Sequence, residues 1–153
     1  MATITRFEDL EIWQLARIQT KDFDKLVEET TLARDFELRN QMNASSGSVM
    51  DRIAEGVERS GNAEFKNFLM IAKGSNREFR SQLYRCSDRR HILHAKFDEL
   101  CQKNIILGNK IMAFINYLQN PDFKGEARKP RTKPSIEPQT SNPELRFKRV
   151  KDY

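Results

Sequence analysis

Apolar side chains recur every three or four residues in four separate stretches of the chain, which is the spacing of one face of an α-helix. These stretches run from Ile12 to Val27, Leu38 to Gly56, Phe65 to Leu83 and Phe97 to Leu118. None of them shows the strict alternation of apolar and polar residues that is typical of a half-buried strand. The chain is therefore predicted to be all-α.

The breaks between these stretches are short and carry residues that begin or end helices. They fall at Glu29-Thr30-Thr31, at Gly61-Asn62 and near residues 89–91. We expect the Asn62 side chain to cap the third helix. Each predicted helix has roughly 20–28 residues and is about 30–40 Å long. Four helices of similar length with short connections predict an antiparallel up-down four-helix bundle over residues 1–120.

The remaining segment, 121–153, differs in composition. It carries nine basic and five acidic residues and holds every proline of the chain, namely Pro121, Pro130, Pro134, Pro138 and Pro143. Its few apolar residues show no period, so it cannot bury enough surface to offset the entropy of ordering. We expect a Pro-rich basic tail that is disordered or extended, and we favour a solvated tail over one that docks.

Composition narrows the class of protein. Charged residues make up 32% of the 153 residues, and no run approaches the ~20 apolar residues needed to span a bilayer. The first residues lack the basic and apolar segments of a signal peptide. The two cysteines, Cys86 and Cys101, are too few for a disulfide framework. We therefore expect a cytoplasmic protein without a membrane partner.

The charge is divided unevenly along the chain. Residues 1–65 carry 8 Lys or Arg and 13 Asp or Glu, whereas residues 66–153 carry 19 Lys or Arg and 9 Asp or Glu. Such asymmetry between the two halves indicates a nucleic-acid or other acidic partner.

A row of basic residues on the third predicted helix provides a candidate site. Lys66, Lys73, Arg77 and Arg80 fall on one line of the helix, outside its apolar face, because steps of 7, 4 and 3 residues return to the same side. Tyr84 extends this line, and three further arginines follow it. Cations bind phosphates and an aromatic ring stacks on bases. The predicted nucleic-acid-binding residues are Lys66, Lys73, Arg77, Arg80, Tyr84, Arg85, Arg89 and Arg90, with an ordinary solvated face as the alternative.

Other side chains suggest that copies of the chain assemble. Leu10 and Trp13 on the first helix, and Ile106 on the fourth, lie away from the predicted core lines. A flank of the second helix outside its core face carries Ala44, Ser48 and Glu55, with Ala54 and Gly56 close by. Its small residues let another helix approach closely. The alternative is that Trp13 covers one end of the bundle.

Catalytic and metal-binding patterns are weak. Ala72-Lys73-Gly74-Ser75 resembles part of a phosphate loop but lacks the upstream glycine and the preceding strand. The spacing of His91 and His94 relative to the two cysteines matches no common zinc pattern. We expect a protein that is not an enzyme and that carries no cofactor or metal.

Several motifs together resemble those of a known family: the small bacterial four-helix-bundle proteins encoded in intervening sequences of 23S ribosomal RNA genes. A related branch is the accessory variability determinant protein of diversity-generating retroelements. The resemblance covers about residues 7–119. It rests on Phe7-x-Asp9-Leu10-x-Ile12-Trp13-x-x-Ala16, Phe36-x-Leu38-x-x-Gln41, Ile53-Ala54-Glu55-Gly56 and Glu64-Phe65-x-x-Phe68-Leu69-x-Ile71-Ala72-Lys73-Gly74-Ser75-x-x-Glu78, with Gln82-Leu83 at its end.

The resemblance implies a homopentamer with a basic surface and, for the retroelement branch, binding to a reverse transcriptase and to nucleic acid. It supplies no catalytic residues. Arg52 stands where the family usually has an asparagine, and the tail after residue 120 lies outside the shared region. Which branch the chain belongs to stays open.

The sequence thus predicts a non-enzymatic, oligomeric bundle that binds nucleic acid, with RNA expected, through phosphates rather than bases. An accessory role for a reverse transcriptase is one form of this prediction. The alternative is a protein-interaction scaffold that contacts nucleic acid only through a partner protein.

Overall fold

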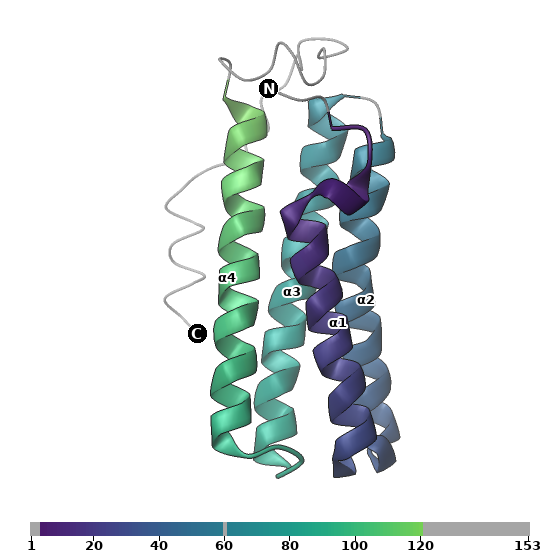
Figure 1. Ribbon diagram of the computed structural model, residues 1–153, viewed down its shortest axis with the longest axis vertical. Helices are drawn as coiled ribbons and strands as arrows, with labels where there is room; N and C mark the ends of the chain where they lie inside the picture. Colours follow the sequence, from purple (N-terminus) through teal and green to yellow (C-terminus); the bar gives the residue numbers. More distant parts are fainter. Residues whose placement is uncertain (1–3, 60, 121–153) are drawn as a thin grey trace.

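The computed structural model describes residues 4–59 and 61–120, so the predicted tail at 121–153 lies outside the described residues. The described residues form helices and no strand, as the sequence predicted. The elements are the 3-10 helices η1 (Phe7–Asp9) and η2 (Thr31–Arg34) and the α-helices α1 (Glu11–Glu29), α2 (Phe36–Glu58), α3 (Asn62–Asp88) and α4 (His94–Gln119). Figure 1 shows the four α-helices side by side along one axis. None of the helices among these residues is both long enough and apolar enough to cross a membrane.

The core consists of two apolar clusters separated by a polar layer. One cluster gathers buried residues such as Ala16 on α1 and Ala72 on α3, and the other gathers residues such as Phe23 and Phe79, which follow on the same helices. Between the clusters along the chain lie the buried polar side chains Gln19, Ser45, Ser46, Asn76 and Asn104. All four helices therefore contribute a polar residue at mid-height of the bundle.

The ends of the helices follow the predicted breaks, with one exception. The first helix ends at Glu29 and the second at Glu58, as expected. Asn62 does not cap the third helix: it is the first helical residue, and the cap position falls to Gly61, whose φ is 94°. Glycine adopts this left-handed backbone without a Cβ penalty, so it takes the cap position in place of the asparagine. The expectation for Asn62 was wrong.

Helices α2 and α3 approach each other closely at small residues. A Cβ atom at Gly56 would lie 2.9 Å from Phe65 Cδ1 and 3.0 Å from the Cβ of Phe68, so no side chain fits there. Farther along, the hydroxyl oxygens of Ser48 and Ser75 lie 2.9 Å apart. The helix that approaches the Ser48 flank is thus α3 of the same chain, where we had expected another subunit.

The N-terminal turn covers one end of the bundle. Leu10 is buried in the core, which overturns its expected place on an outer surface. The Trp13 ring packs against Phe7 of η1, with 5.1 Å between ring centroids, and the Arg17 guanidinium lies 5.9 Å from the centroid of the indole. This arrangement agrees with the alternative in which Trp13 covers the end of the bundle.

Candidate nucleic-acid interface

Three cations of the predicted row lie around one hollow between α3 and α4. Lys73, Arg77 and Arg80 line it from α3, and the hollow has a volume of about 140 Å³. We call it the α3/α4 groove; its other lining residues are Asn76, Asn104, Ile105, Gly108 and Asn109. The helical spacing that predicted one face thus also places these cations beside a polar depression.

Ion pairs within the described part of the chain do not neutralise three charges of this row. No carboxylate there lies within ion-pair distance of Lys66, Arg77 or Arg80. Arg77 is exposed, while Lys66 and Arg80 are half-buried. Half-buried long side chains keep their charged ends toward water, so the positive charge remains available at the surface.

Tyr84 extends the row toward the end of α3. Its ring meets Phe97 of α4 at 74°, with 4.8 Å between the ring centroids, and 56% of its surface remains exposed. Tyr84 therefore lies on the α4 side of α3, the side that also carries the groove.

The arginines after Tyr84 belong to a different feature. Arg85 Nη1 donates a hydrogen bond to Gln41 Oε1 on α2 at 2.6 Å, and Arg89 Nη1 donates to Asp35 Oδ2 at 2.8 Å. Arg90 is exposed in the connection to α4 and has a φ of 62°. The eight predicted residues therefore separate into a row along α3 and a group at its end, where Arg85 and Arg89 turn toward α2.

Asp35 ties three segments together at that end of the bundle. Its Oδ1 accepts from the backbone N–H of Leu38 at 3.3 Å and caps α2, while its Oδ2 lies 2.9 Å from His91 Nε2. The Arg89 guanidinium and the His91 ring lower the pKa of Asp35 to about 2. The charge of Arg89 is thus already paired within the chain, which leaves it a weaker candidate for phosphate binding than Arg77 or Arg80.

The buried polar layer next to the groove was not predicted. Asn76 Nδ2 donates to the backbone carbonyl of Asn104 at 3.0 Å, and Asn104 Nδ2 donates to the backbone carbonyl of Asn76, also at 3.0 Å. Gln19 Nε2 donates to Asn76 Oδ1 at 3.0 Å and its Oε1 accepts from Asn104 Nδ2 at 2.8 Å. The signal was present in the sequence: each of these residues is a polar residue on an otherwise apolar helix face.

The two cysteines lie in the core. Both are free thiols, and burial raises the pKa of Cys86 to about 11 and raises that of Cys101. A thiol becomes a strong metal ligand or nucleophile as the thiolate, so burial makes both unreactive. In residues 4–59 and 61–120, no three His, Cys, Asp or Glu side chains group together as metal ligands would.

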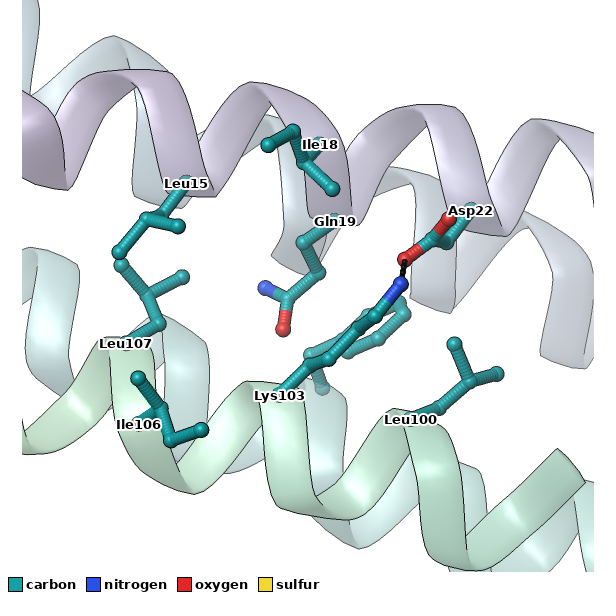
Figure 2. Close-up of a pocket in the computed structure, with 9 residues that line it drawn as sticks. Leu15, Ile18, Gln19, Asp22, Leu100, Lys103, Ile106 and Leu107 are labelled. Carbon is teal, nitrogen blue, oxygen red and sulfur yellow. Dashed lines mark hydrogen bonds and ion pairs between the residues drawn. The ribbon is translucent and has the colours of Figure 1, made fainter. Parts of the chain in front are cut away.

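A second groove, between α1 and α4, has the opposite chemistry. Figure 2 shows Leu15 of α1 pointing toward Leu107 of α4. Ile18 and Ile106 also line the hollow, which has a volume of about 260 Å³. Ile18 and Ile106 keep 46% and 49% of their surface exposed. Lys103 Nζ donates to Asp22 Oδ2 at 3.1 Å across it. We call this hollow the α1/α4 groove.

These features define the class of protein: a four-helix protein with a basic, polar groove on one side and an apolar groove on another. The chain belongs to the 23S rRNA-intervening sequence protein family, because the model of that family matches residues 8–113. Among curated proteins, no match was found.

One similar crystal structure is that of a protein of unknown function from the S23 ribosomal protein family of Bacteroides thetaiotaomicron VPI-5482. Its TM-score with this chain is 0.58 at 19% sequence identity, and the match covers 68% of this chain and 94% of that protein. A likeness at this identity supports the shared fold alone.

Proposed function

We propose that this protein is a non-enzymatic, oligomeric bundle that binds nucleic acid through the basic row on α3. The observation that carries the proposal is the row itself: Lys73, Arg77 and Arg80 line one polar groove, and Arg77 and Arg80 have no ion-pair partner among the described residues. Cations in a row along a rigid rod match the regular spacing of phosphates and displace their counterions.

Assembly would strengthen such a site. One row offers few phosphate contacts, but several copies held in a fixed array bind one polyanion together with a raised effective concentration. The exposed Ile18 and Ile106 of the α1/α4 groove supply an apolar surface that a second copy would cover. A homopentameric ring, the antiparallel up-down order of the helices, and a role as an accessory factor of a reverse transcriptase belong to this proposal.

Binding of the purified full-length protein to single-stranded RNA at low salt tests the proposal directly. We expect a complex that Arg77→Ala with Arg80→Ala weakens strongly and that Arg89→Ala weakens less, because Asp35 already pairs with Arg89. Light scattering on the same sample gives the mass of the assembly. If the protein is a monomer at micromolar concentration, avidity does not contribute to its binding of nucleic acid.

A second candidate function is favoured by the α1/α4 groove. Its exposed isoleucines suit a helix of another protein, and its lining is apolar apart from Gln19 and the ion pair between Lys103 and Asp22. In that case the protein is a scaffold that contacts nucleic acid only through its partner. Absence of any complex with RNA alone at low salt would favour this function over the first.

A further inference from the structure

The basic row on α3 ends at an exposed aromatic ring. Tyr84 lies four residues beyond Arg80, so it continues the same line of the helix, and 56% of its surface is exposed. Four residues of an α-helix rise by about 6 Å, which is the scale of one nucleotide. A strand whose phosphate is bound at Arg80 therefore brings a neighbouring base to the Tyr84 ring.

A buried ring holds Tyr84 in place. Phe97 of α4 is only 9% exposed, and its ring meets that of Tyr84 at 74° with 4.8 Å between the ring centroids. Aromatic pairs favour this edge-to-face arrangement, so the contact fixes the orientation of the exposed ring. The ring of His94 also contacts Phe97, with 6.1 Å between the ring centroids. A ligand that stacks on Tyr84 thus pays little entropy for ordering the side chain.

The charge changes sign beyond this ring. Asp88, one helical turn after Tyr84, is exposed, and Asp98 Oδ2 lies 3.2 Å from His94 Nε2 at the start of α4. Carboxylates repel phosphates, whereas the cations of the row attract them. The Tyr84 end of the row is therefore better suited to an uncharged group of the nucleic acid than to a further phosphate.

The uncharged, flat group of a nucleic acid is the base. Any base stacks on an aromatic side chain, because every base has a π-face. Within a duplex the bases already stack on one another and are paired, so it is unpaired bases that reach an aromatic side chain of a protein.

We propose that Tyr84 is a stacking platform for an unpaired base, and that the row and the ring together select single-stranded RNA over duplex RNA. Arg77 and Arg80 bind phosphates, and the base of an adjacent nucleotide stacks on Tyr84. This inference rests on the proposed function and adds to it the form of the nucleic acid that the row binds.

The test compares three ligands: a single-stranded RNA without self-complementarity, the same strand in a duplex, and an abasic strand of the same length. Fluorescence anisotropy measures the binding of the full-length protein to each ligand at several salt concentrations. We expect Tyr84→Ala to weaken binding to single-stranded RNA about fivefold or more, which is the contribution of one stacked base. Binding to the other two ligands should not change, because neither presents an unpaired base. The salt slope should not change either, because no phosphate contact is lost.

Three further variants separate stacking from packing. Tyr84→Phe keeps the ring and should bind as the native protein does. Tyr84→Leu keeps an apolar contact with Phe97 but removes the ring, so it should lose binding as Tyr84→Ala does. Phe36→Ala is the matched control: Phe36 is 63% exposed beside the Arg39 guanidinium but lies on α2, outside the row, and its loss should leave binding unchanged.

Each contrary outcome has a separate meaning. If Tyr84→Ala or Tyr84→Leu binds single-stranded RNA as tightly as the native protein does, the inference is overturned and the proposed function stands. An equal loss of binding to all three ligands also overturns the inference, because the ring then acts on the fold or on phosphate binding. If the native protein binds none of the three ligands, the proposed function and the inference fail together.

Discussion

Asn76 and Asn104 exchange hydrogen bonds across the bundle: each side-chain amide donates to the other residue's backbone carbonyl at 3.0 Å. Backbone carbonyls inside helices are already occupied by the helix ladder but retain a second lone pair, which these amides use. The reciprocal pair fixes the register of α3 against α4. It therefore also fixes which residues of the two helices meet at the α3/α4 groove.

Breaking this pair should destabilise the fold more than replacing the whole layer. Asn104→Ala removes the donor to Asn76 and Gln19 and leaves the Gln19 side-chain oxygen buried and unpaired, while Asn76 Oδ1 keeps its bond from Gln19 Nε2. We expect this change to cost about 1–3 kcal/mol of unfolding free energy. The combined change Gln19→Leu, Asn76→Leu, Asn104→Leu leaves no unpaired amide and should cost less than Asn104→Ala. Urea denaturation monitored by circular dichroism measures both, and a triple variant less stable than the single one would contradict this view of the layer.

The contact of Gly56 with two phenylalanines gives a second prediction. Gly56→Ala adds a methyl group where the rings of α3 leave no space, so the variant should lose about 1–3 kcal/mol of stability despite the better helix propensity of alanine. Gly47→Ala is the matched control on the same helix. A Cβ atom there meets nothing within 4 Å, and the variant should gain about 0.5–1 kcal/mol. Thermal unfolding measures both variants. If both substitutions shift the melting temperature in the same direction, the close approach of α2 and α3 does not determine the effect of Gly56→Ala.

The contacts of Asp35 predict that a variant that loses both the charge and the helix cap is less stable than one that keeps the cap. Asp35→Ala removes the cap of α2 together with the bonds to Arg89 and His91, and should cost about 1–3 kcal/mol. Asp35→Asn keeps Oδ1 as the capping oxygen but replaces Oδ2, which accepts the bond from Arg89, with an amide donor. It therefore loses the charge and the Arg89 bond but keeps the cap, so its loss of stability should be smaller. An equal loss in the two variants would contradict the separation of the two roles.

The same carboxylate makes stability depend on pH. Its pKa is lowered in the folded state to about 2, so the unfolded chain binds this proton more readily. The stability from the charged form is therefore fully present above the ordinary pKa of an aspartate, about 4, and is lost as the pH falls from there toward 2. As the pH falls from about 4 toward 2, the difference in unfolding free energy between the native protein and Asp35→Asn should shrink. Denaturation curves recorded at several pH values between these limits measure it. A constant difference across the range would refute the assignment to Asp35.

Much of the architecture could be read from the apolar spacing. The breaks at Glu29 and near Glu58 followed from the end of one periodic stretch and the start of the next, because burial of one face determines which residues must be helical. Gly61 was harder to foresee. Whether an asparagine caps or follows the cap depends on one backbone angle that the sequence pattern does not fix.

The candidate site was predictable only along one helix. Spacings of four and three residues placed Lys73, Arg77 and Arg80 together, since they lie on a single rod. The pairing of Arg89 with Asp35 joins residues 54 positions apart, and no local pattern reports it. Asn109 enters the groove from α4, so its place depends on how two helices align. That alignment is set by packing and by the asparagine pair, which the apolar pattern alone does not reveal.

The salt dependence of RNA binding tests the central claim most directly. The logarithm of the binding constant should fall linearly with the logarithm of salt concentration, and Arg77→Ala with Arg80→Ala should reduce the slope by about 1.4, roughly 0.7 for each lost phosphate contact on a single strand. Lys21→Ala with Lys25→Ala removes the same charge from exposed positions of α1 and should leave the slope nearly unchanged. A slope that is flat in the native protein, or that falls equally in both double variants, would contradict binding through the row on α3.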